Sequence, residues 1–261
     1  IKIHYRDAFV FAPFSIMADP DRVRELLLGE RETLFPEEVA YLFRKQLEEA
    51  DVIVLNKVDL LEGEEAERLK ETLQRGFPNR QVMAISAKEG RGVDPWLDLL
   101  LSGRPGANAV LKELDYDRYA TAEAVLGWLN AAVKLAARRS FEPGRFLCRL
   151  AEGMKEEFKK RDAEIGHLKF VLTSAGKAVW ANVTHLAAGP SLGGELLSEA
   201  TGGTLIVNAR VRIAPEELVK IVRRRLEATA GENDLDAEVL NLQCFSPAYP
   251  QPPYAIRKEL A

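Results

Sequence analysis

Three polar residues with a defined spacing directly follow an apolar segment, and their side chains suit recognition of a guanine base. Residues 52–55 are apolar, and Asn56, Lys57 and Asp59 then form an Asn-Lys-x-Asp sequence. An aspartate carboxylate can accept hydrogen bonds from the ring N–H and the exocyclic amine of guanine, a donor pair that adenine lacks. The asparagine amide can reach N7 of the base and brace the loop, and the lysine stem can lie along the face of the base. Because a site built to hydrogen-bond a group rejects an analogue without it, we expect Asp59 to select guanine over adenine.

A second polar loop strengthens this interpretation. Residues 81–85 are expected to form another buried strand, and Ser86, Ala87 and Lys88 follow it. GTPases place a Ser-Ala-Lys loop at this point, where a backbone N–H meets the guanine carbonyl oxygen. The two loops occur in the expected order, one crossover helix apart, and together they favour guanine-nucleotide binding. The Asn-Lys-x-Asp sequence alone would fit an ordinary strand-to-loop junction with solvated charges equally well.

The segments around these loops alternate between strands and helices. The expected strands are 9–18, 52–55 and 81–85, and the expected helices begin near Pro20, Pro36, Glu64 and Asp94. In the last helix we expect Asp94 to be the cap and Pro95 to take the first helical position. This alternation predicts a doubly wound parallel α/β sheet, in which ligands bind beyond the carboxyl ends of the strands.

The pattern changes after a turn-rich segment at residues 102–108. Residues 120–135 are apolar and alanine-rich, so we expect a strand over at least part of them, with a helix as the alternative. Helices are expected from Pro143 and from Pro215, and strands at 167–172, 177–184, 204–213 and 236–245, with a glycine-rich loop between the second and third of these strands. This order predicts an α+β ferredoxin-like domain.

Composition limits the classes of protein that fit this chain. It has 261 residues, of which 47% are hydrophobic and 29% are charged, as expected of a globular protein with one or two domains. The net charge of −4 argues against a general nucleic-acid binder. No apolar run approaches the ~18 residues of a membrane-spanning helix. Cys148 and Cys244 do not make a disulfide framework, and we expect a cytoplasmic protein without a membrane or nucleic-acid partner.

With both loops and the second domain considered, the chain resembles the CobW/HypB/UreG group of GTPases, and CobW most closely. The resemblance covers most of residues 8–245. The matching residues are Gln46-Leu-Glu-Glu-Ala-Asp51 running into Asn56-Lys57-Val58-Asp59, then Ser86-Ala87, then Phe141-Glu-Pro143-Gly-Arg145-Phe146 at the opening of a helix. The resemblance implies GTP hydrolysis coupled to the handling of a metal or a cobalamin cofactor.

The chain departs from that family in two motifs. It contains no Gly-x-x-x-x-Gly-Lys-Ser/Thr P-loop, which would cradle phosphates and hold Mg²⁺, and no Cys-x-Cys-Cys metal motif. We therefore expect the C-terminal portion of a longer protein: residues 1–103 as part of a GTP-binding domain, 104–118 as a linker, and 119–261 as the ferredoxin-like domain with a proline-rich tail. The intact protein is expected to hydrolyse GTP with Mg²⁺, and this chain alone is not.

Two further sets of charged residues each have a competing explanation. Asp19 follows an expected strand, where the family carries an acidic residue near its switch region. It is a candidate for holding a Mg²⁺-bound water, but a helix cap is the favoured reading. Arg223, Arg224 and Arg225 could contact phosphate or an acidic partner, but a solvated helix stripe is favoured.

A third set consists of possible metal ligands. His167 and His185 would lie nearly opposite each other if residues 174–177 turn a hairpin, and Cys244 is on the last strand of the same sheet. Imidazole and thiolate suit Zn²⁺ or Co²⁺. A register change of one residue would put the two histidines on opposite faces, and ordinary sheet residues are the favoured explanation.

These observations combine into one functional hypothesis with two alternatives. We expect a GTP-binding metallochaperone or cobalamin-cofactor accessory protein that binds GTP or GDP through Asn56, Lys57, Asp59, Ser86 and Ala87. Its cargo would be Zn²⁺ or Co²⁺, and its partner a client metalloprotein or a cobalamin-dependent enzyme. The alternatives are a non-enzymatic protein-interaction module and a corrinoid-enzyme reactivation or assembly GTPase. Homo-oligomer formation stays open.

Overall fold

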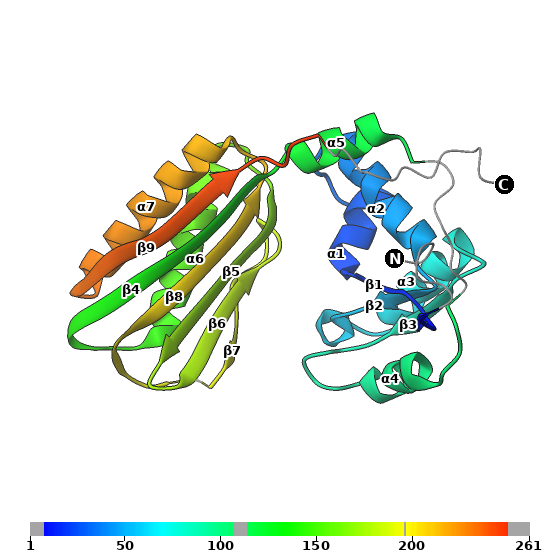
Figure 1. The fold of residues 1–261 in the computed structure, drawn as a ribbon, viewed down its shortest axis with the longest axis horizontal. Coiled ribbons are helices and arrows are strands. Elements are labelled where there is room, and N and C mark those ends of the chain that lie inside the picture. The colour runs from blue at the N-terminus through cyan, green and yellow to red at the C-terminus, as the bar shows by residue number, and fades with distance from the viewer. Residues whose placement is uncertain (1–7, 107–113, 196, 250–261) are drawn as a thin grey trace. The chain divides into compact units, whose positions relative to one another are not determined.

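The computed structural model describes residues 8–106, 114–195 and 197–249 (Figure 1). They form two compact units, and the division falls between Tyr119 and Ala120. The first unit is built on a parallel sheet and the second on an antiparallel sheet. Within the described residues, no helix is both long enough and apolar enough to cross a membrane.

The first unit contains a three-stranded parallel sheet in the order β1-β2-β3. Its strands are β1 (Ser15–Ala18), β2 (Val52–Leu55) and β3 (Gln81–Ala84). All four residues of the central strand β2 are buried, because both faces of the sheet are covered. Partner residues run in step from strand to strand, so Leu55 pairs with both Ala18 and Ala84 at the carboxyl edge.

Helices cover both faces of this sheet. After β1 the chain forms a short α1 (Pro20–Arg22) and a π-helical turn η1 (Val23–Leu28), followed by α2 (Glu37–Glu49), the 3₁₀ turn η2 (Val58–Leu60), α3 (Glu65–Gly76) and α4 (Val93–Leu101). Ile53 and Leu55 pack with residues of α2 and α3, whereas Val52 and Val54 pack with residues of α4. Alternate residues of a strand point to opposite faces. The first unit is therefore doubly wound, as the alternation of elements predicts.

Two expected boundaries in this unit were wrong. The strand predicted at 9–18 is confined to Ser15–Ala18, since only these four residues pair with β2. Helix α4 begins at Val93 with Gly92 as its N-cap, instead of being capped by Asp94. Gly92 has φ 75°, a backbone conformation that glycine adopts without steric cost.

The second unit is a six-stranded antiparallel sheet covered on one face by two helices (Figure 1). Its elements are α5 (Tyr116–Ala124, which spans the division), β4 (Gly127–Phe141), α6 (Pro143–Lys159), β5 (Ile165–Ser174), β6 (Lys177–Val183), β7 (Ser191–Gly194), β8 (Ala200–Val211), α7 (Pro215–Glu232) and β9 (Leu235–Phe245). The strand order is β7-β6-β5-β8-β4-β9. The four strands β9-β4-β8-β5 have the ferredoxin-like order, and the hairpin β6-β7 extends the sheet at the β5 edge.

The structure resolves the ambiguous segment at 120–135 into both of its alternatives. Helix α5 ends at Ala124, and strand β4 starts at Gly127. Along β4, buried residues alternate with more exposed ones, with Leu129, Val133 and Leu135 facing the core. The glycine-rich loop expected after β6 also contains a short strand, β7, which pairs with β6.

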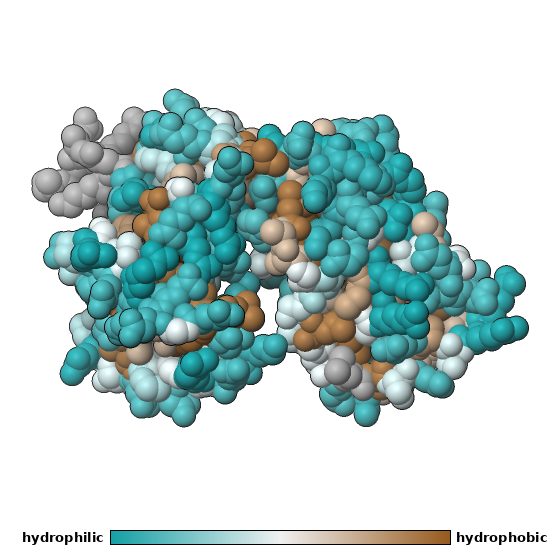
Figure 2. Space-filling view, turned by 180° about the vertical axis from the view of Figure 1, so that it is seen from behind, coloured by the Kyte–Doolittle hydropathy of each residue, from teal (hydrophilic) through white to brown (hydrophobic). Residues whose placement is uncertain are grey.

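The core of the second unit lies between the sheet and helices α6 and α7. Phe146 and Phe158 of α6 are completely buried in one apolar cluster, which also contains Phe170 of β5 and Val207 of β8. Burial stabilises a fold by about 25 cal/mol per Å² of apolar surface, and large aromatic side chains contribute more of this surface than smaller residues do. On the molecular face shown in Figure 2, hydrophilic residues cover most of the surface and hydrophobic residues form scattered patches.

Candidate functional site

The two predicted loops leave the same edge of the first unit's sheet. Strands β2 and β3 are parallel neighbours, and the loops follow their last residues, Leu55 and Ala84. The ladder continues into the loops: Asn56 N donates to Ala18 O at 3.0 Å, and Val58 N donates to Ile85 O at 3.2 Å. The sheet therefore holds the backbones of both loops in a defined position.

The Asn56 side chain connects the two loops. Its Oδ1 accepts a hydrogen bond from Lys57 N at 2.8 Å and another from Ala87 N at 3.0 Å. The amide therefore braces both loops, but it also engages the Ala87 N–H that we expect to meet the guanine carbonyl oxygen. A base carbonyl at that position would have to share this N–H or take it from Asn56.

Asp59 is oriented by the second loop. Ser86 Oγ donates to Asp59 Oδ1 at 2.6 Å and accepts from Glu89 N at 3.2 Å. Ser86 is completely buried, whereas Asp59 is partly exposed. A buried hydroxyl thus holds one oxygen of a carboxylate whose other oxygen is a further hydrogen-bond acceptor.

Lys57 takes a strained backbone conformation and pairs with Asp19. Its φ and ψ are 64° and 32°, in the left-handed region that costs a residue with a Cβ atom about 1 kcal/mol or more. Its Nζ lies 2.5 Å from Asp19 Oδ2. The ion pair links the first loop to the segment after β1. Nothing in the local sequence indicates this pairing, since the two residues are 38 positions apart.

Asp19 also acts as a helix cap. Its Oδ1 accepts from Asp21 N at 2.9 Å at the start of α1. The capping role favoured from the sequence is therefore present. Both carboxylate oxygens have protein partners, one in the cap and one in the pair with Lys57. The role in holding a Mg²⁺-bound water stays a prediction.

Gly92 closes the second loop and provides a test of its geometry. Ser86 N donates to Arg91 O at 2.9 Å, and a Cβ at Gly92 would lie 2.7 Å from Ala84 O. We expect Gly92→Ala to lower the free energy of unfolding of the first unit by about 1–3 kcal/mol. The strain of a positive φ at alanine and the clash of the new Cβ with Ala84 O both contribute to this loss. Urea denaturation measures this. Gly63→Ala is the control: Gly63 also has a positive φ, 55°, but has no neighbour within 4 Å of the added Cβ. An equal loss in both variants would contradict the clash.

The structure does not bring the three predicted metal ligands together. His167 pairs with Arg210 on the sheet face away from the helices, whereas Cys244 packs toward the helix-covered core and its Sγ donates to Pro215 O at 3.4 Å. His185 lies beyond the end of β6, and its Nδ1 accepts from Ala187 N at 3.0 Å. Burial also raises the pKa of the Cys244 thiol to about 11, which disfavours the thiolate that metals bind. The structure thus separates the three side chains, because His167 and Cys244 face opposite sides of the sheet and His185 lies beyond the end of β6.

The three consecutive arginines of α7 lie mainly on the outside of the second unit. Arg224 forms an ion pair with Glu157 of α6, and the Arg225 guanidinium lies against Gly153 of the same helix. Arg223 is exposed. These placements agree with the solvated stripe favoured from the sequence.

His167 gives the second unit a pH dependence whose sign follows from its environment. Burial, with Lys169 and Arg210 nearby, lowers the pKa of His167 from 6.5 to about 4. The unfolded chain therefore binds this proton at a higher pH than the folded chain does, so the His167 contribution to stability is lost as the pH falls from about 6.5 toward 4. We expect a loss of about 2 kcal/mol between pH 7 and pH 5, measured by urea denaturation, and a flatter profile for His167→Gln. Identical slopes for the two proteins would contradict this assignment.

A parallel sheet with helices on both faces defines the doubly wound α/β class of domain, in which ligands bind beyond the carboxyl ends of the strands. Residues 17–84 match the family described as "CobW/HypB/UreG, nucleotide-binding domain". These residues are therefore similar to that family, and the match confirms the resemblance seen in the sequence.

One curated protein and two solved structures are similar to parts of this chain of different length. The hydrogenase maturation factor HypB of Cupriavidus necator is 40% identical over 62 residues, which are 23% of this chain and 17% of HypB. The Zn(II)-bound YjiA GTPase from E. coli is 15% identical with a TM-score of 0.27, over 85% of this chain and 62% of YjiA. A Zn(II)-bound triple mutant of YjiA is 16% identical with a TM-score of 0.26, over 81% and 59%. The chain thus spans less than two thirds of the length of each of these relatives. With TM-scores of 0.27 and 0.26, the two structural likenesses support no conclusion about the function of this chain.

Proposed function

We propose that the first unit recognises the guanine base of GTP or GDP at the carboxyl edge of its parallel sheet. The observation that carries this proposal is the 2.6 Å hydrogen bond from the buried Ser86 hydroxyl to Asp59 Oδ1. It holds the carboxylate in one orientation before any ligand arrives, and a preorganised acceptor loses less freedom on binding. The match of residues 17–84 to a nucleotide-binding family supports the same conclusion.

Each of the five residues has a distinct role in this proposal. Asp59 accepts from the ring N–H and the exocyclic amine of guanine, and Ser86 orients Asp59. Asn56 holds the two loops together and offers its amide toward N7. The Lys57 stem covers the face of the base, which requires its ammonium to leave or lengthen the contact with Asp19. Ala87 donates its N–H to the base carbonyl once Asn56 releases or shares it.

The wider function that we infer is that of a GTP-dependent metallochaperone or cobalamin-cofactor accessory protein in the cytoplasm. The family match to residues 17–84 and the similarity to a hydrogenase maturation factor support this proposal. Zn²⁺ or Co²⁺ would be the cargo, and the second unit would contact a client metalloprotein. The 261 residues contain no P-loop motif. We therefore give their side chains no role in holding the phosphates of the nucleotide or its Mg²⁺.

Competition binding tests base recognition directly. A fluorescent GDP analogue is bound to the chain and displaced by GTP, GDP, ATP or ADP. We expect guanine nucleotides to displace it at concentrations about 100-fold lower than adenine nucleotides, because adenine leaves the Asp59 carboxylate unpaired. Equal displacement by all four nucleotides would overturn the proposal. Mg²⁺-dependent GTP turnover by the chain alone, at the rates of intact GTPases, would contradict the expectation that these 261 residues by themselves do not hydrolyse GTP.

A further inference from the structure

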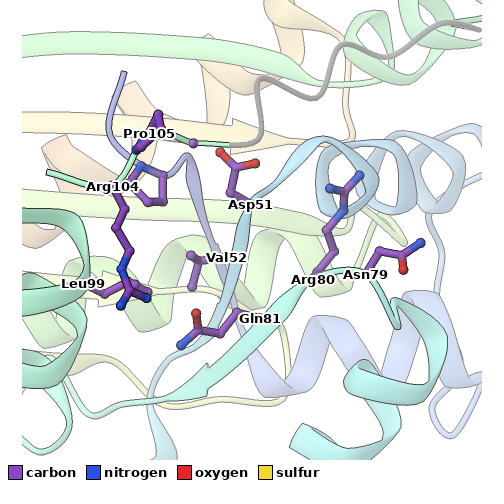
Figure 3. Close-up of a pocket in the computed structure, with 10 residues that line it drawn as sticks. Asp51, Val52, Asn79, Arg80, Gln81, Leu99, Arg104 and Pro105 are labelled. Atoms are coloured by element: carbon purple, nitrogen blue, oxygen red, sulfur yellow. The ribbon is translucent and has the colours of Figure 1, made fainter. Parts of the chain in front are cut away.

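Charged side chains outside the base loops collect in a small pocket of the first unit and on the sheet of the second unit. The pocket has a volume of about 200 Å³, and its lining includes Arg80 and Arg104 (Figure 3). Figure 3 shows the two guanidinium groups pointing apart, and that of Arg80 already donates to Glu48 O at 2.5 Å. These two cations therefore do not converge on one ligand. In the second unit, by contrast, Lys169 and Arg210 lie on the neighbouring strands β5 and β8.

Four side chains form a row across the face of this sheet that points away from helices α6 and α7 (Figure 1). The row runs from Phe245 of β9 to Trp128 of β4. It continues from Trp128 to Arg210 of β8 and then to His167 of β5. On each of β4, β8 and β5, a residue next to the row belongs to the apolar core, and alternate residues of a strand face opposite ways. The row therefore lies on the face opposite the core.

Arg210 is the polar centre of this row. Its guanidinium lies 3.7 Å from the centroid of the Trp128 ring, and that centroid lies 6.1 Å from the centroid of the Phe245 ring. Stacking uses the flat face of a guanidinium and leaves the N–H groups at its edge free to donate. Within the described residues, Arg210 has neither a hydrogen bond nor an ion pair. The tryptophan therefore holds in place a set of donors that has no acceptor in this part of the chain.

A second cation, Lys169, adds to the positive potential around Arg210. It lies two residues after His167 on β5, is exposed, and forms no ion pair with any described residue. Burial, Lys169 and Arg210 lower the pKa of His167 to about 4, so this imidazole is neutral at pH 7. Glu123 is close enough for Arg210 to act on its pKa, but burial raises the pKa of this carboxyl and it forms no ion pair with Arg210. The two cations therefore lack an acidic partner among the described residues.

Two further rows on the same face complete this surface. The second row is polar and the third is apolar, and they consist of Gln243, Asn130, Asn208, Lys169 and Asn182, and of Ala132, Ile206, Val171 and Trp180. Ile206 is 37% exposed and Phe245 is 46% exposed. The acids of this face, Asp236 and Glu238, lie toward the other end of β9 from Phe245. We refer to the three rows as the Arg210 surface. It combines arginine and tryptophan with exposed apolar side chains, as the central residues of protein interfaces do.

We propose that the Arg210 surface binds a segment of a partner protein that carries a carboxylate and an apolar side chain. The carboxylate accepts charge-assisted hydrogen bonds from Arg210 and Lys169, and the apolar side chain covers Ile206. This proposal deepens the proposed function and rests on its statement that the second unit contacts a client protein. A nucleic acid fits less well. Nucleic-acid binders neutralise many phosphates, whereas the three rows contain two cations in a chain of net charge −4.

The strand geometry sets the spacing that such a segment needs. Arg210 and Ile206 are four residues apart on β8, a distance of about 13 Å at ~3.3 Å per residue. A segment that runs along β8 reaches both side chains with an acidic and an apolar residue about four positions apart when it is extended, or about eight apart when it is helical. A general attraction of acidic chains to the two cations would require neither spacing.

Selection from a random peptide library displayed on phage tests this surface on the 261-residue chain. No nucleotide is added, so failure here is separate from failure of base recognition. We expect the enriched peptides to carry Asp or Glu at one of the two spacings from an apolar residue. The absence of enrichment, or enriched peptides without an acidic residue at either spacing, overturns the proposal. Oligouridine RNA is the second probe: RNA that displaces the peptides and requires Arg210 for its own binding overturns the choice of a protein partner.

Three variants assign the binding to this surface. A synthetic copy of an enriched peptide is expected to bind Arg210→Gln at least about 10-fold more weakly than the unchanged chain, because charge-assisted hydrogen bonds are lost. Lys169→Gln, at an exposed position that does not endanger the fold, is expected to weaken binding about 3-fold or more. Arg223→Gln is the matched control, since it removes an exposed arginine from α7 on the other side of the sheet, and it should leave peptide binding unchanged. Equal losses in the three variants, or binding that survives both Arg210→Gln and Lys169→Gln, overturn the assignment.

Discussion

Asp59→Ala is expected to abolish the preference for guanine over adenine nucleotides. The variant loses an acceptor for two donors of the base, each a hydrogen bond to a charged group worth about 1.5–3 kcal/mol. Guanine nucleotides should therefore bind at least about 100-fold more weakly. The affinity for adenine nucleotides should change little, because adenine lacks the donor pair that the carboxylate accepts. Displacement of a fluorescent GDP analogue by GTP and by ATP measures both quantities on one sample.

Two companion variants separate recognition from structural damage. Asp98→Ala removes an exposed aspartate from α4 and should leave nucleotide selectivity unchanged. Ser86→Ala keeps Asp59 but removes the hydroxyl that orients it at 2.6 Å, so an intermediate loss of selectivity is expected. Selectivity that persists in Asp59→Ala would contradict the assignment of base recognition to Asp59. If no nucleotide displaces or binds in either protein, an interaction module without a nucleotide is favoured.

Phe146→Ala is expected to cause the largest loss of stability in the second unit, about 3–5 kcal/mol, through lost burial and the cavity left behind. Phe146 is completely buried, and its ring meets that of Phe141 edge-on with centroids 5.7 Å apart. Urea denaturation followed by tryptophan fluorescence measures this loss. Trp128 and Trp180 belong to the second unit, whereas Trp96 belongs to the first.

The control for this variant is Leu240→Ala, which shortens a side chain that is 54% exposed on β9. It should cost less than about 1 kcal/mol, since little apolar surface returns to water. The first unit should unfold at the same urea concentration in both variants as in the unchanged protein, because each unit has its own apolar core. A loss below about 1 kcal/mol for Phe146→Ala would contradict the central position of its ring.

The local sequence was enough to predict the sheet of the first unit and the position of its polar loops. A strand at 52–55 without polar residues must have both of its faces covered by other elements. Asn56, Lys57 and Asp59 then lie in the loop at the carboxyl end of this strand. The ferredoxin-like order of the second unit likewise followed from the alternation of strands and helices. Its alanine-rich segment at 120–135 was ambiguous because small apolar residues fit either a helix or a strand, and pairing of β4 with both β8 and β9 decided it.

Long-range contacts were decided by the tertiary structure alone. The pair of Lys57 with Asp19 and the hold of Ser86 on Asp59 join residues 38 and 27 positions apart, and no local pattern encodes such distances. The opposed faces of His167 and Cys244 depend on strand register, where one residue reverses every side chain. Side-chain type and period are properties of neighbouring residues, whereas these sites depend on which distant backbones the packed core brings together.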